Sequence, residues 1–233
     1  MPRSGSRLPA RRSRPPAAIP PRRRSDPVPE TRHFFRPGEH RPLLAHDPLN
    51  AIVGPRPIGW ISSLSPAGIA NLAPYSFFNA FNYRPQIVGF ASVGWKDSIA
   101  NIEATGEFAW NLATEELAEA MNATSAMAGP EVDEFELAGL TKAEGHLIAV
   151  PLVAAAPVSF ECRLCQIVRL QSADGEAIDT WVAFGEVVGI HIAPGAIIDG
   201  IYATAAARPI LRAGGPGDYF TLDPEKRFTM LRP

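Results

Sequence analysis

The sequence predicts a mainly β protein, either an antiparallel barrel or a sandwich, that carries a few flanking helices. Two observations support this class. Hydrophobic residues make up 46% of the 233 residues, so the chain can bury a sizeable core. The β-rich runs also outnumber the helical segments, and their order lacks the regular alternation of strand and helix that builds a parallel sheet.

The first predicted elements are two strands joined by a turn, and ordered structure is expected to begin near Ala51. Residues 55–77 read PRPIGWISSLSPAGIANLAPYSF, where Pro66 and Gly68 mark a chain reversal between two apolar runs. Residues 86–93, QIVGFASV, form a short apolar run bounded by a proline and a glycine. This run predicts a buried strand.

Two helices and a further strand are predicted next. Residues 96–106, KDSIANIEATG, have helical character, with Asp97 or Ser98 as the cap and a glycine at the end. Residues 107–113, EFAWNLA, predict a strand. Residues 115–126, EELAEAMNATSA, are rich in Ala, Leu and Glu and predict a second helix.

Two long β-rich runs follow late in the chain. Residues 158–170 read VSFECRLCQIVRL, and residues 180–192 read TWVAFGEVVGIHI. Asp174 and Gly175 lie between them and form a strong turn signal. The sequence therefore predicts two long strands joined by a turn.

Charge is distributed unevenly along the chain, although the net charge is only −2. Residues 1–41 contain 11 Arg and three acidic residues, and the remaining 192 residues have a balance of −10. Residues 1–32 are rich in Pro and Arg and lack apolar periodicity, which predicts a disordered basic extension before a domain at 33–233. A nucleic-acid arm and a targeting peptide are alternatives, but we favour a solvated extension.

Several functional classes are excluded by features that the sequence lacks. It contains no G-x-G-x-x-G fingerprint, no P-loop and no G-x-S-x-G nucleophile elbow. It has no apolar run of about 18 residues that would span a membrane, and its acidic body lacks the basic stripe of a duplex-binding surface. Two cysteines and no export signal predict a cytoplasmic enzyme or binding protein, without nucleic-acid or membrane partners.

The cysteines and histidines are interpreted as structural. Cys162 and Cys165 form a C-x-x-C, but this spacing within a strand places them on opposite faces, and one pair is too few for structural zinc. His191 could reach a site from the end of its strand, but a structural role is favoured. No metal site is predicted, because no ligand spacing relates the five histidines, which are His33, His40, His46, His146 and His191.

Two segments within residues 55–111 suggest a cofactor. Residues 71–81, NLAPYSFFNAF, combine aromatic and amide side chains and, although aromatic strands are usually core, could form a wall for a planar ring. Residues 96–98 begin a predicted helix, where backbone N–H groups, a hydroxyl and an ammonium suit a phosphate. FMN has both a phosphate and a hydrogen-bonding ring and fits the two segments together.

The sequence resembles the flavin reductase-like family of FMN-binding split-barrel proteins. The resemblance runs in family order from Phe34 to Leu231 and implies a six-stranded antiparallel Greek-key barrel with flanking helices. It also implies a homodimer that binds FMN near the subunit interface. The motifs are PRPIGWISSLSPAGIANLAPYSFFNAF (55–81), KDSIANIEATGEFAWNL (96–112), EAMNATSA (119–126), EVDEFELAGLT (131–141), FECRLCQIV (160–168) and FGEVVGIHI (184–192).

The resemblance further implies a cofactor site. Ser62 and Ser63 would lie beside the flavin or its ribityl chain, and Asn79 would support the ring-binding loop. Arg56 is a second candidate for the phosphate or for the pyridine nucleotide. The phosphate would meet Lys96, Asp97 and Ser98. The isoalloxazine ring would be lined by Asn71, Ala73, Pro74, Tyr75, Ser76 and Phe77.

Three positions depart from many relatives. Arg84 and Pro85 stand where many relatives carry two prolines, and Ser98 stands where they carry Thr, so a hydroxyl is retained there. Residues 179–181, Asp-Thr-Trp, replace a polar stretch that sometimes contains His. This last difference affects the nicotinamide side of the site more than the flavin side.

The leading hypothesis is an NAD(P)H-dependent flavin reductase, since family members typically reduce flavin with NADH or NADPH and many supply a partner monooxygenase. Hydride transfer between the two rings needs no protein nucleophile, so no catalytic residue is predicted. The alternative is a non-enzymatic FMN-binding electron-transfer protein, similar to flavoredoxins. A nucleic-acid-associated protein that uses the Arg-rich segment ranks last.

Overall fold

The computed structural model describes residues 33–39 and 43–232. The predicted extension at 1–32 therefore lies outside the described residues. The chain divides into two compact units, of which one combines the two ends of the chain and the other runs from residue 42 to 222. The larger unit contains every strand and α-helix of the described residues.

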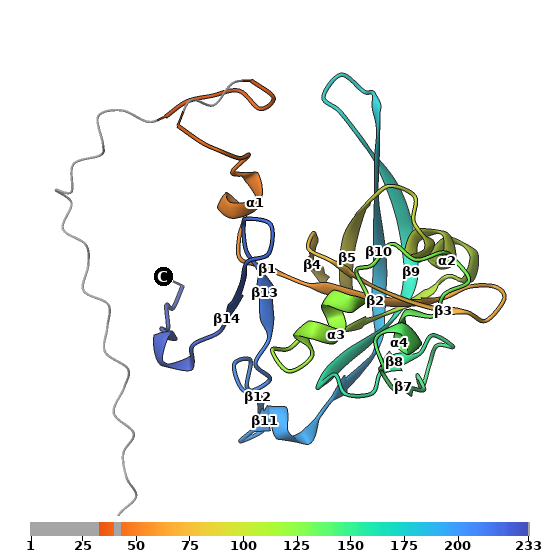
Figure 1. The fold of residues 1–233 in the computed structure, drawn as a ribbon. Helices are drawn as coiled ribbons and strands as arrows, with labels where there is room; N and C mark the ends of the chain where they lie inside the picture. The colour runs from red at the N-terminus through yellow and green to blue at the C-terminus, as the bar shows by residue number, and fades with distance from the viewer. Residues whose placement is uncertain (1–32, 40–42, 233) are drawn as a thin grey trace, which may run out of the picture. The chain divides into compact units, whose positions relative to one another are not determined.

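The larger unit is built on one sheet whose strand order is β3-β2-β6-β9-β10-β5-β4 (Figure 1). All neighbouring strands are antiparallel, which confirms the predicted mainly β class. The sheet has seven strands within the described residues, one more than the six that the family resemblance implied. They are β2 (Gly59–Leu64), β3 (Ala70–Tyr75), β4 (Phe78–Tyr83), β5 (Gln86–Val93), β6 (Glu107–Asn111), β9 (Val158–Gln171) and β10 (Ala177–Ile192).

The sheet curls back on itself to form a barrel. Its edge strands β3 and β4 are separated in sequence by only Ser76 and Phe77. Three residue steps span at most about 11 Å, whereas a flat seven-stranded sheet would be about 29 Å wide. The edges can therefore meet only if the sheet curves. Tyr75 on β3 packs against Phe90 on β5 with a 4.5 Å separation of ring centroids, which closes the barrel on the inside.

Short helices and small sheets complete the described structure. The α-helices are α1 (Leu49–Ile52), α2 (Asp97–Thr105), α3 (Ala118–Ala123) and α4 (Glu134–Leu137). The 3₁₀ helices are η1 (Pro194–Ala196) in the larger unit and η2 (Pro224–Lys226) in the smaller one. In the small sheets, β13 (Ile210–Arg212) lies between β1 (Arg56–Pro57) and β14 (Tyr219–Thr221), β7 (Lys142–Ala143) pairs with β8 (Leu152–Val153), and β11 (Ile197–Ile198) pairs with β12 (Ile201–Tyr202).

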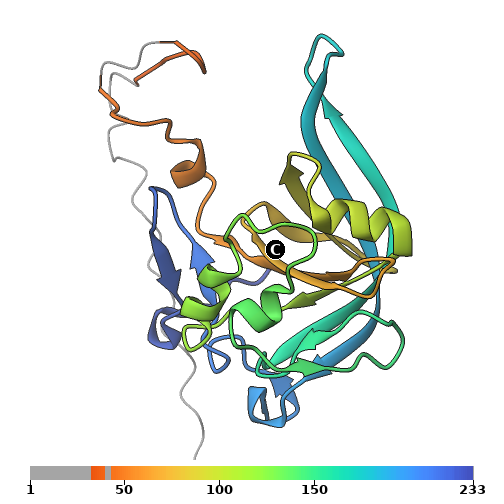
Figure 2. The ribbon, with the colours of Figure 1, turned by 45° about the vertical axis from the view of Figure 1, so that its right-hand side comes forward.

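The turns predicted from glycine and proline join the expected strands. Gly68, at φ 83°, donates its N–H to the Ser65 carbonyl at 2.9 Å between β2 and β3. Gly175, at φ 85°, does the same to Ser172 at 3.0 Å between β9 and β10. The β9–β10 hairpin projects well beyond the other strands of the sheet (Figures 1 and 2).

Three local predictions need correction. The second strand predicted within residues 55–77 ends at Tyr75, because the chain bends at Ser76 and Phe77 and then enters the opposite edge of the sheet as β4. Neither Asp97 nor Ser98 caps α2: Lys96 is the N-cap residue, and no side chain makes a capping bond there. The predicted helix at 115–126 is confined to α3 at its centre.

Both faces of β2 are buried, so its alternating side chains pack in two different environments. Trp60 packs in a cluster with Leu72, Met121 and Phe135, whereas Ile61 packs in the barrel core. Neighbouring residues on a strand face opposite sides. Ser62 and Ser63 are therefore both buried but lie in different environments.

Candidate functional site

A cleft of about 380 Å³ opens beside β3, where the N-terminus of α2 approaches the segment that joins α3 to α4. Small-molecule sites usually enclose about 300–1,000 Å³. The cleft is lined by Asn71, Ala73, Pro74 and Tyr75, by Trp95, Lys96, Asp97 and Ser98, and by Thr124, Ser125, Ala126, Met127, Ala128, Pro130 and Glu134.

A buried amide network fixes the wall of this cleft. The Asn71 side-chain amide donates to Ser98 Oγ at 2.8 Å and to Ser63 Oγ at 3.3 Å. The amide of Asn101 on α2 also donates to Ser63 Oγ, at 3.3 Å. All four side chains are buried. Because the network joins β2, β3 and α2, it holds the first turn of the helix in a fixed position against the strand.

The first turn of α2 is suited to an anion. Lys96, the N-cap residue, is extended, and no side chain caps the turn within the described part of the chain. The first N–H groups of a helix have no partner within the helix, and Lys96, Asp97 and Ser98 all line the cleft. The Asp97 carboxylate opposes an anion at this place, so the backbone N–H groups and the Lys96 ammonium must provide the attraction.

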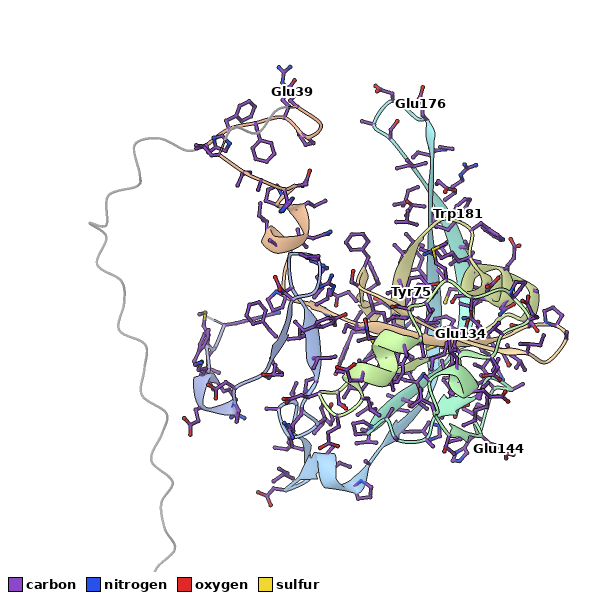
Figure 3. All side chains as sticks on the ribbon, in the orientation of Figure 1. Glu39, Tyr75, Glu134, Glu144, Glu176 and Trp181 are labelled. Atoms are coloured by element: carbon purple, nitrogen blue, oxygen red, sulfur yellow. The ribbon has the colours of Figure 1, made fainter. Side chains whose placement is uncertain are left out.

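Two ionisable side chains of the cleft are shifted toward their neutral forms; Figure 3 labels both, Tyr75 and Glu134. Burial raises the pKa of Tyr75, and the charges of Asp97 and Glu134 add to this effect, although hydrogen bonding with serines lowers it. Burial also raises the pKa of Glu134, even though its Oε2 accepts the Leu72 N–H at 3.0 Å. The cleft therefore disfavours additional negative charge near Glu134.

Arg56, a candidate for the phosphate, is not among the residues that line the cleft. Its side chain is buried and donates to backbone carbonyls, from Nε to Ser76 at 3.0 Å and from Nη1 to Val53 at 2.5 Å and to Asn50. These bonds tie the segment before β1 to the bend between β3 and β4. In this structure the Arg56 guanidinium therefore holds two chain segments together.

Five further candidates also lie outside the cleft lining, and one of them, Ser63, belongs to the buried amide network described above. Ser62 donates to the Pro151 carbonyl at 2.7 Å, on the face of β2 opposite to Ser63. The Asn79 side chain accepts the N–H of its neighbour Ala80 at 2.8 Å. Ser76 and Phe77 form the bend, and Phe77 is 43% exposed. Their contact with a flavin stays a prediction.

The cleft also contains residues that the sequence did not single out. They are Trp95 and the segment between α3 and α4, which ends at Glu134. Thr124 accepts a bond from Trp60 Nε1 at 3.0 Å and donates to the Met121 carbonyl at 2.7 Å, which anchors the start of this segment. The family-like motifs at 119–126 and 131–141 were the available signal for it.

The base of the β9–β10 hairpin supports Trp95. The Trp95 ring meets Trp181 of β10 edge-on, with centroids 5.1 Å apart, and the Arg169 guanidinium lies 5.1 Å from the Trp181 ring (Figure 3 labels Trp181). The Asp179 carbonyl accepts the Gly94 N–H at 2.9 Å. The Asp-Thr-Trp stretch that departs from many relatives is thus in contact with the loop that lines the cleft.

None of the helices in residues 33–39 and 43–232 is both long enough and apolar enough to cross a membrane.

Comparison with solved structures supports the fold assignment. Nitrilotriacetate monooxygenase component B from Bacillus cereus superposes with a TM-score of 0.77 at 28% identity, over 86% of this chain and 99% of that one. The Pseudomonas fluorescens 2-nitrobenzoate 2-nitroreductase NbaA superposes with a TM-score of 0.70 at 29% identity, over 78% and 88% of the two chains.

Comparison with known sequences identifies the family. An uncharacterised protein of Aquifex aeolicus is 37% identical over 170 residues, which cover 70% of this chain and 83% of that protein. The family described as "Flavin reductase like domain" matches residues 54–210, a span that includes every residue lining the cleft. The chain therefore belongs to the flavin reductase-like family.

Proposed function

We propose that this chain is an NAD(P)H-dependent flavin reductase that binds FMN in the cleft beside β3. The observation that carries the proposal is the juxtaposition of an uncapped helix N-terminus with a buried amide and aromatic wall. These two features suit the phosphate and the ring of one ligand. Membership of the flavin reductase-like family supports the same ligand class.

The proposed phosphate position is the first turn of α2. Lys96 would contribute a charged hydrogen bond, and the N–H groups of Asp97 and Ser98 would contribute backbone bonds. The helix dipole alone stabilises an exposed anion by about 0.3–1 kcal/mol, whereas a hydrogen bond to a charged group contributes about 1.5–3 kcal/mol. Lys96 should therefore be the most sensitive residue at this end.

The ring would lie along β3, against Asn71, Ala73, Pro74 and Tyr75. Bound FMN supplies a ring that accepts hydride from a nicotinamide. The protein's part is to hold the two rings in contact and exclude water. Asn71 is already fixed by Ser63 and Ser98, so this wall of the cleft is preorganised. Hydride transfer between the two rings needs no protein nucleophile.

The proposal is tested by measuring FMN affinity and NADH and NADPH oxidation by the full chain. Lys96→Ala should weaken FMN binding about 10- to 100-fold, the equivalent of one charged hydrogen bond. Lys226→Ala, which removes an exposed lysine outside the cleft, should leave affinity unchanged. Tight FMN binding with no oxidation of either nucleotide would instead indicate an electron carrier. Absence of FMN binding would refute both functions.

We further propose that the protein forms a homodimer and supplies reduced flavin to a monooxygenase. The similarity to a protein named as a monooxygenase component, at 28% identity, supports the second part. Exposed apolar side chains on the β9–β10 hairpin, including Val168, Leu170 and Ile178, support the first. A monomeric mass in light scattering at all concentrations would contradict the dimer.

A further inference from the structure

Three side chains far apart in sequence meet near the N-terminal end of β9 and the C-terminal end of β10. His146 lies on the loop between β7 and β8, Glu161 lies on β9 and His191 lies on β10. One potential ligand atom from each residue lies within 4.8 Å of the others. The two imidazole rings meet edge to face, with centroids 4.8 Å apart. None of the three residues lines the flavin cleft.

Glu161 fixes the geometry of this cluster. It is fully buried, and its Oε1 lies 2.5 Å from His191 Nε2 and accepts the His146 N–H at 2.9 Å. Its Oε2 accepts the N–H groups of Leu147 at 2.6 Å and Ile148 at 3.0 Å. These four contacts stabilise the ionised carboxylate and hold it against both the loop and the His191 ring.

The backbone of His146 is held in place, whereas its imidazole ring can rotate. Glu161 holds the His146 N–H, and Arg163 donates to the neighbouring Leu147 carbonyl at 3.2 Å, so the loop backbone is fastened at both positions. The His146 side chain is exposed, and its ring makes no hydrogen bond to the described residues. It can therefore turn toward His191 without moving the loop.

We propose that His146 and His191 bind a divalent transition-metal ion, with Glu161 as the carboxylate that orients His191 and balances the ion's charge. With His191 Nε2 bonded to Glu161, Nδ1 is available to the ion. A ligating histidine commonly donates its second ring N–H to a carboxylate in this way. Tetrahedral bonds of about 2.0–2.1 Å need ligand atoms about 3.4 Å apart, a distance that rotation of the exposed His146 ring can supply.

The ligand set selects the class of ion. Imidazole nitrogens suit Zn²⁺, Ni²⁺ and Cu²⁺, whereas Mg²⁺ and Ca²⁺ prefer oxygen ligands. Two imidazoles leave coordination positions open to water, as in accessible zinc sites. The positive charge of Arg163 opposes the ion, while the buried Glu161 carboxylate favours it.

The test is a calorimetric titration of the full chain, without an affinity tag and stripped with a chelator, against Zn²⁺. The expected result is one saturable ion per chain, together with Co²⁺ absorption bands typical of imidazole coordination. His146→Ala should weaken Zn²⁺ binding at least tenfold, because it removes one of two ligands. His46→Ala removes an exposed imidazole elsewhere and should not change it.

Two outcomes would overturn the proposal: no saturable Zn²⁺ binding by the wild-type chain, or equal binding by the wild type and His146→Ala. The exposed position of His146 makes this variant suitable, since its side chain supports no buried contact of the fold. Glu161→Gln is a weaker choice, because that carboxylate anchors three backbone N–H groups of the loop.

Discussion

Asn71 illustrates how one side chain connects the sequence to the proposed site. Its amide is buried in β3 and donates to hydroxyl groups on β2 and α2, so it joins the three elements that form one wall of the cleft. A buried amide without partners would destabilise the fold by about 1–3 kcal/mol. The same bonds that satisfy Asn71 also position Ser98 at the helix start. Structural and functional requirements therefore coincide at this residue.

Glu134 gives a prediction of pH dependence. Its folded-state pKa is raised above the ordinary value of 4.5, mainly by burial. The carboxyl therefore contributes stability that is fully present below pH 4.5 and is lost as the pH rises through the folded-state pKa. Glu134→Gln stays neutral and can still accept the Leu72 N–H, so it should gain stability relative to wild type between pH 5 and pH 7.

Urea unfolding at the two pH values measures this difference. Glu136→Gln, an exposed carboxylate on the same helix, is the matched control and should not show the same pH-dependent gain. A pH-independent difference between Glu134→Gln and wild type would show that the carboxyl is not held toward its neutral form.

At the scale of elements, local patterns predicted most of the architecture. The strand at 86–93 and the helix that begins at 97 have the expected positions, because their apolar runs are bounded by glycine and proline. The cap of α2 was wrong because Ser98 is bonded to Asn71 and is thus engaged in a long-range contact. The strand β4 was not predicted, because alternation alone gives no information on which sheet edge a segment joins.

β10 lies so close to the Phe108 ring at Gly185 that a larger residue would not fit there. A Cβ atom on Gly185 would lie 2.3 Å from Cε1 of Phe108, a fully buried ring of the barrel core that cannot move aside. Gly185→Ala should therefore destabilise the fold by about 1–3 kcal/mol through overpacking. Gly195→Ala, where an added Cβ has no neighbour within 4 Å, is the control. Equal midpoints of thermal unfolding for the two variants would contradict this packing argument.

At the scale of the whole molecule, closure of the barrel determines which residues meet. The sequence predicted no metal site because no short spacing relates the histidines. The cluster on which the proposed metal site rests forms because antiparallel pairing of β9 and β10 brings His191 opposite Ser159 and so close to Glu161. Likewise, seven of the predicted site residues line one cleft, whereas Arg56 and Ser62 face other surroundings. Such long-range pairings cannot be read from local spacing.

Charge asymmetry leads to a prediction for the complete chain. Residues 1–32 carry nine Arg and two acidic residues, so their removal shifts the net charge from −2 to −9. All the described residues that line the cleft lie between 71 and 134, so the proposed FMN site uses no side chain of the Arg-rich segment. Deletion of 1–32 should therefore leave FMN affinity within about twofold of the full chain, as measured by fluorescence titration at 0.15 M salt. If the Arg-rich segment instead has a role at the cleft, affinity will fall strongly, and if it serves nucleic acid, only salt-sensitive nucleic-acid binding will disappear.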